Sequence, residues 1–262
     1  MKLKLVKASQ GLVWVRQGIL ACRQQPLGFI GLLGLFGCAA LLLVGLPARI
    51  GAMLIVGAMP VMWMGFMLAT RRVLAGQRIT LSVMFEALKG PDAPRRAFAI
   101  LGAVYVLATL FVLQVSQWLG PDQEAIDKLM STTEDAAELL TNPLIQEDML
   151  WRMLLTIPVS LVFWHTPALL LWARLPVAKA LFFSAVATWR NIGAFVVYAM
   201  GWMGIMLAVA LLDRLLLALI PEPFFGNMAA IVASMWLASA FYASLYFTVI
   251  DCFEPQQRQL DA

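Results

Sequence analysis

The chain has 262 residues, of which 62% are hydrophobic and 13% are charged. Soluble domains average about 45–50% apolar and about 25% charged residues, so an ordinary soluble globular protein is excluded. Intrinsic disorder is excluded as well, because disordered chains combine low hydrophobicity with high charge. The long unbroken apolar runs also argue against a lipid-facing β-barrel, whose strands alternate apolar and polar residues. The composition therefore predicts an all-α, polytopic membrane protein.

Six apolar stretches are each long enough to cross a bilayer, which takes about 20 residues of helix. The transmembrane helices are predicted at 27–46, 50–69, 97–118, 153–172, 194–212 and 228–250. Residues 1–26 precede this domain, which covers 27–250, and residues 251–262 form a tail. The first stretch is longer than the apolar region of a cleavable signal peptide, so we expect it to be a retained helix.

The basic residues predict the orientation of the chain in the membrane. Fifteen of the 19 Lys and Arg residues lie before the first span, after the sixth, or in the loops that follow spans two and four. Because short cytoplasmic loops carry the excess of Lys and Arg, both termini are expected in the cytoplasm.

The other side of the membrane receives an acidic segment, 120–151. Its eight carboxylates and single basic residue, Lys128, give it a net charge of −7. One or two short helices are expected there, ending near Asn142. The segment is interpreted either as a solvated cap or as a docking surface for a cation or a basic partner.

Short amphipathic segments precede three of the predicted spans. In the first, Ser9, Arg16 and Arg23 recur every seven residues, which places them on one helical face, and Leu12, Val15, Ile19 and Cys22 occupy another. Segments 80–89 and 177–191 lead into spans three and five in the same way. This pattern predicts three repeats of an interfacial helix followed by a helix pair, with the basic faces toward lipid headgroups.

Three segments carry a resemblance to a known family: the opening KLKLVKASQGLVWVRQGILACRQQPLGF, the stretch GFMLATRRVLAG at 65–76, and the block 164–198, which begins Trp-x-x-Pro-Ala-Leu. Over nearly its whole length the chain resembles an uncharacterised six-span inner-membrane protein family of β-proteobacteria. The layout is also similar to the membrane domains of bacterial glycerophosphodiester phosphodiesterases, whose chemistry lies in a separate soluble domain. The resemblance implies a fold and an inner (plasma) membrane location, but no catalytic residues.

Polar side chains inside the spans are candidates for an intramembrane site, because such groups are costly in lipid and often functional. The candidates are His165, Ser160, Ser234 and Tyr242. His165 is interpreted either as a neutral imidazole bonded to a carbonyl freed by a nearby proline or to another helix, or as part of a proton relay or ligand site. Ser234, Ala238 and Tyr242, spaced by four, form either a packing face or the lining of a cavity.

Asp213 and Arg214 end the apolar core of span five and are expected to reach the outer interface. A structural role is favoured for this pair, and a functional role stays open if span five is longer and tilted.

No catalytic, nucleotide-binding or metal-binding motif occurs in the chain, and a single histidine provides no histidine cluster. No cofactor, no metal and no catalytic residue is therefore predicted. The basic residues flank the membrane, so anionic lipid is a better partner than nucleic acid. The expected headgroup contacts are Arg16, Arg23, Arg71, Arg72 and Arg190.

The sequence thus favours a non-enzymatic inner-membrane protein that interacts with lipid or supports the envelope. Two alternatives stay open. The first is an accessory subunit of a larger membrane complex, bound to a membrane-protein partner or to further copies of itself. The second is a small-solute transporter or channel.

Overall fold

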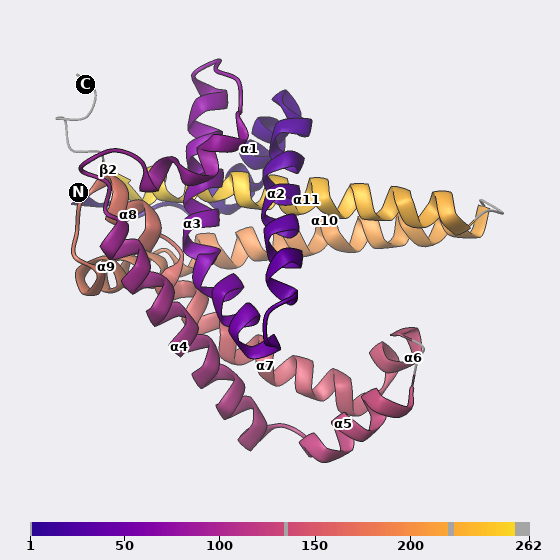
Figure 1. The fold of residues 1–262 in the computed structure, drawn as a ribbon. Helices are drawn as coiled ribbons and strands as arrows, with labels where there is room; N and C mark the ends of the chain where they lie inside the picture. The colour runs from indigo at the N-terminus through magenta and orange to yellow at the C-terminus, as the bar shows by residue number, and fades with distance from the viewer. Residues whose placement is uncertain (1, 134–135, 220–222, 255–262) are drawn as a thin grey trace.

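The computed structural model describes residues 2–133, 136–219 and 223–254 (Figure 1). Glu134 and Asp135 of the acidic segment, residues 220–222 and the tail from residue 255 lie outside the described residues. The chain folds almost entirely into helices, which confirms the all-α class. The elements in chain order are β1 (Lys2–Leu3), α1 (Gln10–Gln24), α2 (Pro26–Val44), α3 (Ala48–Leu74), η1 (Leu81–Leu88), α4 (Arg95–Leu119), α5 (Gln123–Thr132), α6 (Ala136–Thr141), α7 (Pro143–Phe163), α8 (Thr166–Trp172), α9 (Val177–Arg190), α10 (Ile192–Leu219), α11 (Pro223–Cys252) and β2 (Phe253–Glu254).

Six helical segments are long and apolar enough to cross a membrane, as the sequence predicts. They are Pro26–Val44, Arg49–Leu74, Arg95–Leu119, Pro143–Trp172, Ile192–Leu215 and Met228–Cys252. The fourth begins ten residues earlier than the expected 153–172, because a cap starts the helix there. The Asn142 side chain accepts a hydrogen bond from the Leu144 backbone N–H at 3.0 Å, and Pro143 occupies the first helical turn, where its missing N–H costs nothing.

The three expected interfacial segments correspond to α1, η1 and α9, which precede the helix pairs α2–α3, α4–α7 and α10–α11. One of them differs in kind, because residues 81–88 form a 3₁₀ helix and not an α-helix. The acidic segment holds α5 and α6 between the two members of the second pair. The threefold repeat itself stays a prediction.

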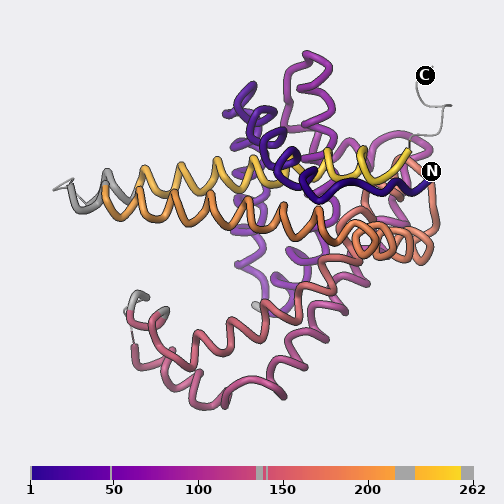
Figure 2. The backbone as a smooth tube through the Cα atoms, turned by 180° about the vertical axis from the view of Figure 1, so that it is seen from behind, coloured from indigo at the N-terminus to yellow at the C-terminus, as the bar shows by residue number. Residues whose placement is uncertain are grey.

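The helix pairs diverge from one end of the molecule. Figures 1 and 2 show the long α10–α11 hairpin and the α4–α7 pair running away from the end that carries the N-terminus, α8 and α9. Helix α3 links the pairs by packing against both α4 and α11. Helix α2 lies further out than α3. In its most apolar 18-residue stretch 11% of the residues are buried, whereas the corresponding share for α3 is 44%. Most of the α2 surface is therefore available to lipid.

The two ends of the described chain meet in a short antiparallel ribbon. Lys2 pairs with Glu254 and Leu3 with Phe253, and the Lys4 backbone N–H donates to the Cys252 carbonyl at 2.8 Å. The ribbon closes the end from which the helix pairs diverge.

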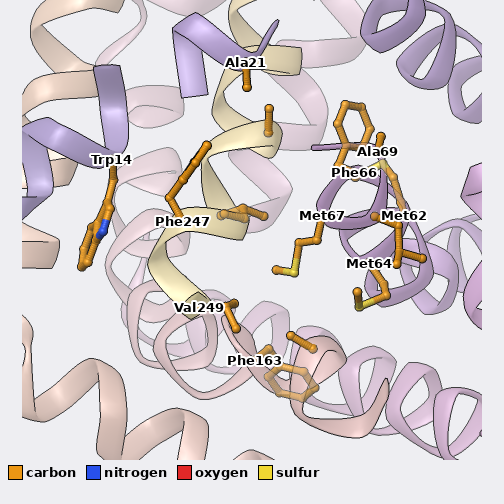
Figure 3. Close-up of a cluster of buried hydrophobic side chains, with 14 of the residues drawn as sticks. Trp14, Ala21, Met62, Met64, Phe66, Met67, Ala69, Phe163, Phe247 and Val249 are labelled. Atoms are coloured by element: carbon orange, nitrogen blue, oxygen red, sulfur yellow. The ribbon is translucent and has the colours of Figure 1, made fainter. Parts of the chain in front are cut away.

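The core lies where α1, α3, α7 and α11 approach one another. Figure 3 shows Trp14 of α1, Phe163 of α7, Phe247 and Val249 of α11 and a group of methionines from α3 around one another. All of these side chains are buried. Away from this core the helix pairs diverge from one another. The far parts of the pairs therefore keep apolar faces exposed.

Candidate functional site

Helix α1 has one face inside the protein and one face outside it. Its buried face includes Trp14, Gly18 and Cys22, which pack against α10 and α11. Its exposed face alternates large apolar and basic residues: Leu12, Arg16, Leu20 and Arg23. The expected apolar face of α1 is therefore divided, because Val15 and Cys22 enter the protein core while Leu12 stays outside. The helix is a part of the bundle and not a segment that merely lies on a lipid surface.

Helix α9 combines basic and aromatic residues on its exposed surface. Ala180, Ser184, Ala187 and Thr188 face the protein, whereas Phe182 is 63% and Trp189 is 72% exposed. Lys179 and Arg190 are exposed on the same short helix. Aromatic rings beside basic side chains are typical of a helix at the membrane–water interface. The 3₁₀ helix η1 also exposes two apolar side chains, Leu81 and Phe85.

Arg71 and Arg72, at the end of α3, have different environments. Arg71 is exposed. Arg72 forms an ion pair with Glu86 of η1 at 2.7 Å and donates a hydrogen bond to Thr80 Oγ1 at 3.2 Å. The charge of Arg72 is thus matched inside the protein, where it ties η1 to α3. We define the basic–apolar surface as the exposed residues Leu12, Arg16, Leu20, Arg23, Arg71, Leu81, Phe85, Lys179, Phe182, Trp189 and Arg190.

The helix that carries His165 is interrupted at that residue, between α7 and α8. The His165 backbone N–H donates to Ser184 Oγ at 2.9 Å, and Thr188 Oγ1 donates to the Leu161 carbonyl at 2.9 Å. The hydroxyls of α9 therefore satisfy the groups that the interruption frees.

The His165 side chain is fully buried between two aromatic rings. Its ring centroid lies 5.7 Å from that of Phe195 and 5.3 Å from that of Phe253. The Thr248 backbone of α11 interacts with the imidazole, and within the described part of the chain neither ring nitrogen forms a hydrogen bond of ordinary geometry. Phe253 belongs to β2, so His165 lies at the closed end of the molecule and not in the middle of the bundle.

Ser234 and Tyr242 line one groove between α10 and α11, together with Asp213. The groove has a volume of about 470 Å³, and Ala238 of the predicted stripe also lines it. Asp213 lies 21 residues after the start of α10, which is about 32 Å along a helix and matches the thickness of the hydrocarbon core, about 30 Å. A helix of this length allows the carboxylate to reach the membrane boundary. The groove can hold an apolar chain between largely hydrocarbon walls, whereas Arg214 is exposed and is not part of its lining.

Ser160 reaches the other side of the same tyrosine. A smaller cavity of about 150 Å³ is lined by Ser160, Tyr242, Trp63 and Trp164, with Phe241 and Leu245. Phe241 and Tyr242 line both spaces. The structure thus places Ser160 and Ser234 on either side of Tyr242, and it places His165 in neither lining.

A protein of Burkholderia thailandensis named as a probable inner membrane protein is 33% identical to this chain over 262 residues. The alignment covers 98% of this chain and 96% of the relative. The chain belongs to the family of that inner membrane protein. No family model matches the chain, and no solved structure matches it. With its six apolar helices, it is a multi-pass inner-membrane protein.

Two polar residues of this inner-membrane protein have structural roles that the sequence does not reveal. Asn191 is buried, accepts a hydrogen bond from the Val6 backbone N–H at 2.8 Å and donates to the Lys4 carbonyl at 3.0 Å. Asp251 accepts from the Gln10 side-chain amide at 2.7 Å. Both residues tie the N-terminal segment to distant helices. In the sequence, Asn191 is marked only by its position shortly before span five, and that position does not indicate which residues it bonds.

Among residues 2–133, 136–219 and 223–254, no three side chains of the His, Cys, Asp or Glu type gather into a metal site. Cys22 and Cys252 are buried free thiols, and Cys38 is exposed.

Proposed function

We propose that this inner-membrane protein is a non-enzymatic, lipid-interacting protein that binds anionic headgroups through the basic–apolar surface. The observation that carries the proposal is the exposed face of α1, where Leu12 and Leu20 lie beside Arg16 and Arg23. Apolar side chains of this kind enter the headgroup region while the guanidinium groups meet the phosphates.

The charges of this surface support anionic over neutral lipid. Arg16, Arg23, Arg71, Lys179 and Arg190 are exposed and form no ion pair within the described part of the chain. Near an anionic leaflet each basic side chain contributes about 1 kcal/mol of attraction. Phe182 and Trp189 add aromatic anchors beside Arg190.

The proposal includes an orientation in which both termini, α1, η1 and α9 lie on the cytoplasmic side. Most of the basic residues then face the cytoplasm, and the acidic segment with α5 and α6 faces the periplasm, as the positive-inside rule requires. A reporter enzyme fused to the C-terminus tests this arrangement. If a reporter that is active only in the periplasm is active in this fusion, the C-terminus is periplasmic and the proposed orientation is wrong.

Native mass spectrometry of the tagged protein, extracted with its lipids from its own membranes, tests the lipid role. The wild-type protein is expected to retain anionic phospholipid, and the double variant R16Q/R23Q is expected to retain less. Lys128→Gln is the matched control, because this exposed residue lies on α5, outside the basic–apolar surface. Equal retention by all three proteins contradicts the proposal.

The same spectra distinguish lipid binding from the alternative that the protein is an accessory subunit of a larger complex. The exposed carboxylates of α5, Glu124 and Asp127, offer a surface to a basic partner. A protein that is retained in fixed stoichiometry, with no specific lipid, would favour a subunit role over lipid binding.

A further inference from the structure

A second groove lies between α3 and α4, at the opposite ends of these helices from Arg71 and η1. Its volume is about 640 Å³. The α3 wall includes Arg49 and Val56, and the α4 wall includes Val106, Leu110, Gln114 and Gln117. The groove shares no residue with the basic–apolar surface.

A close helix contact forms the closed end of this groove. A Cβ atom on Gly102 would collide with the carbonyl oxygen of Gly57, so the two backbones touch there. Beyond this contact the walls continue to Arg49 on α3 and to Gln117 on α4. The apolar lining begins next to the glycine pair, at Val56 and Val106, and the polar groups follow at the open end.

The dimensions of the groove match one leaflet of a membrane. The twelve residues from Val106 to Gln117 span about 16 Å of helix, which is half of a hydrocarbon core of about 30 Å. Arg49 begins the second candidate span, and Gln114 and Gln117 lie near the end of the third. The polar end of the groove thus lies at the depth of lipid headgroups, and its apolar part lies at the depth of acyl chains.

The positive charge of Arg49 at the polar end of the groove favours an anionic ligand. The described ion pairs join Arg72 with Glu86 and Arg152 with Asp148, so Arg49 is matched by no carboxylate of the described chain. A guanidinium group binds phosphate oxygens through two parallel hydrogen bonds, and primary amides can donate further ones. We infer that this groove binds one anionic phospholipid, with its phosphate at Arg49, Gln114 and Gln117 and one acyl chain along Val56, Val106 and Leu110.

Photo-crosslinking in nanodiscs tests this inference independently of the proposed function. The probe is phosphatidylglycerol with a diazirine in one acyl chain, diluted into phosphatidylethanolamine around the full-length protein. Adducts are expected in peptides that cover residues 49–56 and 106–117. Adducts spread evenly over all six spans, or a co-purifying protein that excludes the probe from these peptides, would overturn the inference.

Two variants separate the headgroup contact from the apolar wall. Arg49→Gln removes a charged hydrogen-bond donor and is expected to lower the adduct yield in these peptides about tenfold. Ala52→Phe keeps Arg49 and fills the wall with a ring, and it is expected to lower the same yield. Arg49→Lys keeps the charge and should restore part of the labelling, which an unfolded variant would not do.

The matched control is R16Q/R23Q, which should leave these adducts unchanged whether or not the basic–apolar surface binds lipid. Wild-type labelling in both Arg49→Gln and Ala52→Phe would overturn the inference, and retention data for R16Q/R23Q would still decide the proposed function.

Discussion

The Trp14 indole N–H donates a hydrogen bond to the Asp251 carboxylate at 2.8 Å, across 237 residues of chain. This bond joins α1 to the last turn of α11 beside the ribbon of β1 and β2. The Trp14 ring also packs against Phe195 at 5.3 Å and Tyr198 at 6.1 Å between centroids. One side chain thus connects the first helix with the last two.

Replacing Trp14 by Phe is expected to destabilise the protein by about 1.5–3 kcal/mol, the usual contribution of a hydrogen bond to a charged group. Phenylalanine is also smaller than the fully buried indole, so the loss combines the missing bond to Asp251 with weaker packing against Phe195 and Tyr198. Thermal unfolding in mild detergent measures the effect. Trp118→Phe is the control, because Trp118 is 75% exposed, and it should leave the midpoint unchanged.

Gly18→Ala is expected to be destabilising by about 1–3 kcal/mol, the range found when a packed interface is overfilled. A Cβ atom at this position would collide with Ser244 and the Ala240 carbonyl of α11. Gly34→Ala in α2 is the matched comparison, since nothing lies within 4 Å of a Cβ atom there. The unfolding midpoint of the Gly34 variant should equal or exceed that of wild type, because alanine favours helix over glycine. Equal effects of the two substitutions would contradict this packing of α1.

Thr188→Val should weaken the junction between α7 and α9. The substitution keeps the shape of the side chain but removes the 2.9 Å donor to the Leu161 carbonyl, which keeps only the 3.5 Å contact with Ser184 Oγ, and a poorly paired buried acceptor costs about 1–3 kcal/mol. Hydrogen exchange of the His165 region should accelerate with the loss. Thr156→Val serves as the control, because Thr156 is exposed and bonds only within its own helix. Unchanged exchange in the Thr188 variant would show that Leu161 needs no partner from α9.

Cys22 is expected to resist alkylation in the folded protein at neutral and mildly alkaline pH. Burial raises the pKa of the Cys22 thiol to about 12, so the reactive thiolate is scarce below that pH. A variant with Cys38→Ser and Cys252→Ser leaves Cys22 as its single thiol for a maleimide at pH 8. Labelling should be slow in mild detergent and fast after unfolding in sodium dodecyl sulfate. Equally fast labelling in both states would place Cys22 at the surface.

Tryptophan positions show where patterns along the chain predict the fold and where they do not. Trp14, Trp118 and Trp189 all lie toward the ends of predicted spans, where aromatic side chains commonly form a belt at the membrane interface. Trp118 and Trp189 are exposed, whereas Trp14 is fully buried. Only Trp14 meets Asp251, Phe195 and Tyr198. Its place in the core is therefore decided by neighbours that are distant in the sequence.

The sequence predicts the part of the candidate intramembrane site that lies on a single helix, but not the contacts between helices. A spacing of four along one helix predicts that Ser234, Ala238 and Tyr242 share a face, and all three line the groove between α10 and α11. That Asp213 lines the same groove, and that Ser160 meets Tyr242 from another helix, depends on how α7, α10 and α11 pack. Helical periodicity carries no information on such contacts between elements.

The sequence by itself determined the six membrane helices, because a stretch of about 20 apolar residues enters a bilayer whatever its neighbours are. It also placed the start of the first span within one residue of Pro26, where the missing proline N–H is tolerated in the first turn, but it missed the start of the fourth at Pro143, ten residues before the expected position. The tertiary structure decided which helix faces became part of the core and where α7 ends. It also decided that Arg72, and not Arg71, forms an ion pair with Glu86. Each of these outcomes depends on partners far away in the chain, such as Asp251 for Trp14 and Ser184 for the His165 backbone, which only packing brings within hydrogen-bonding distance.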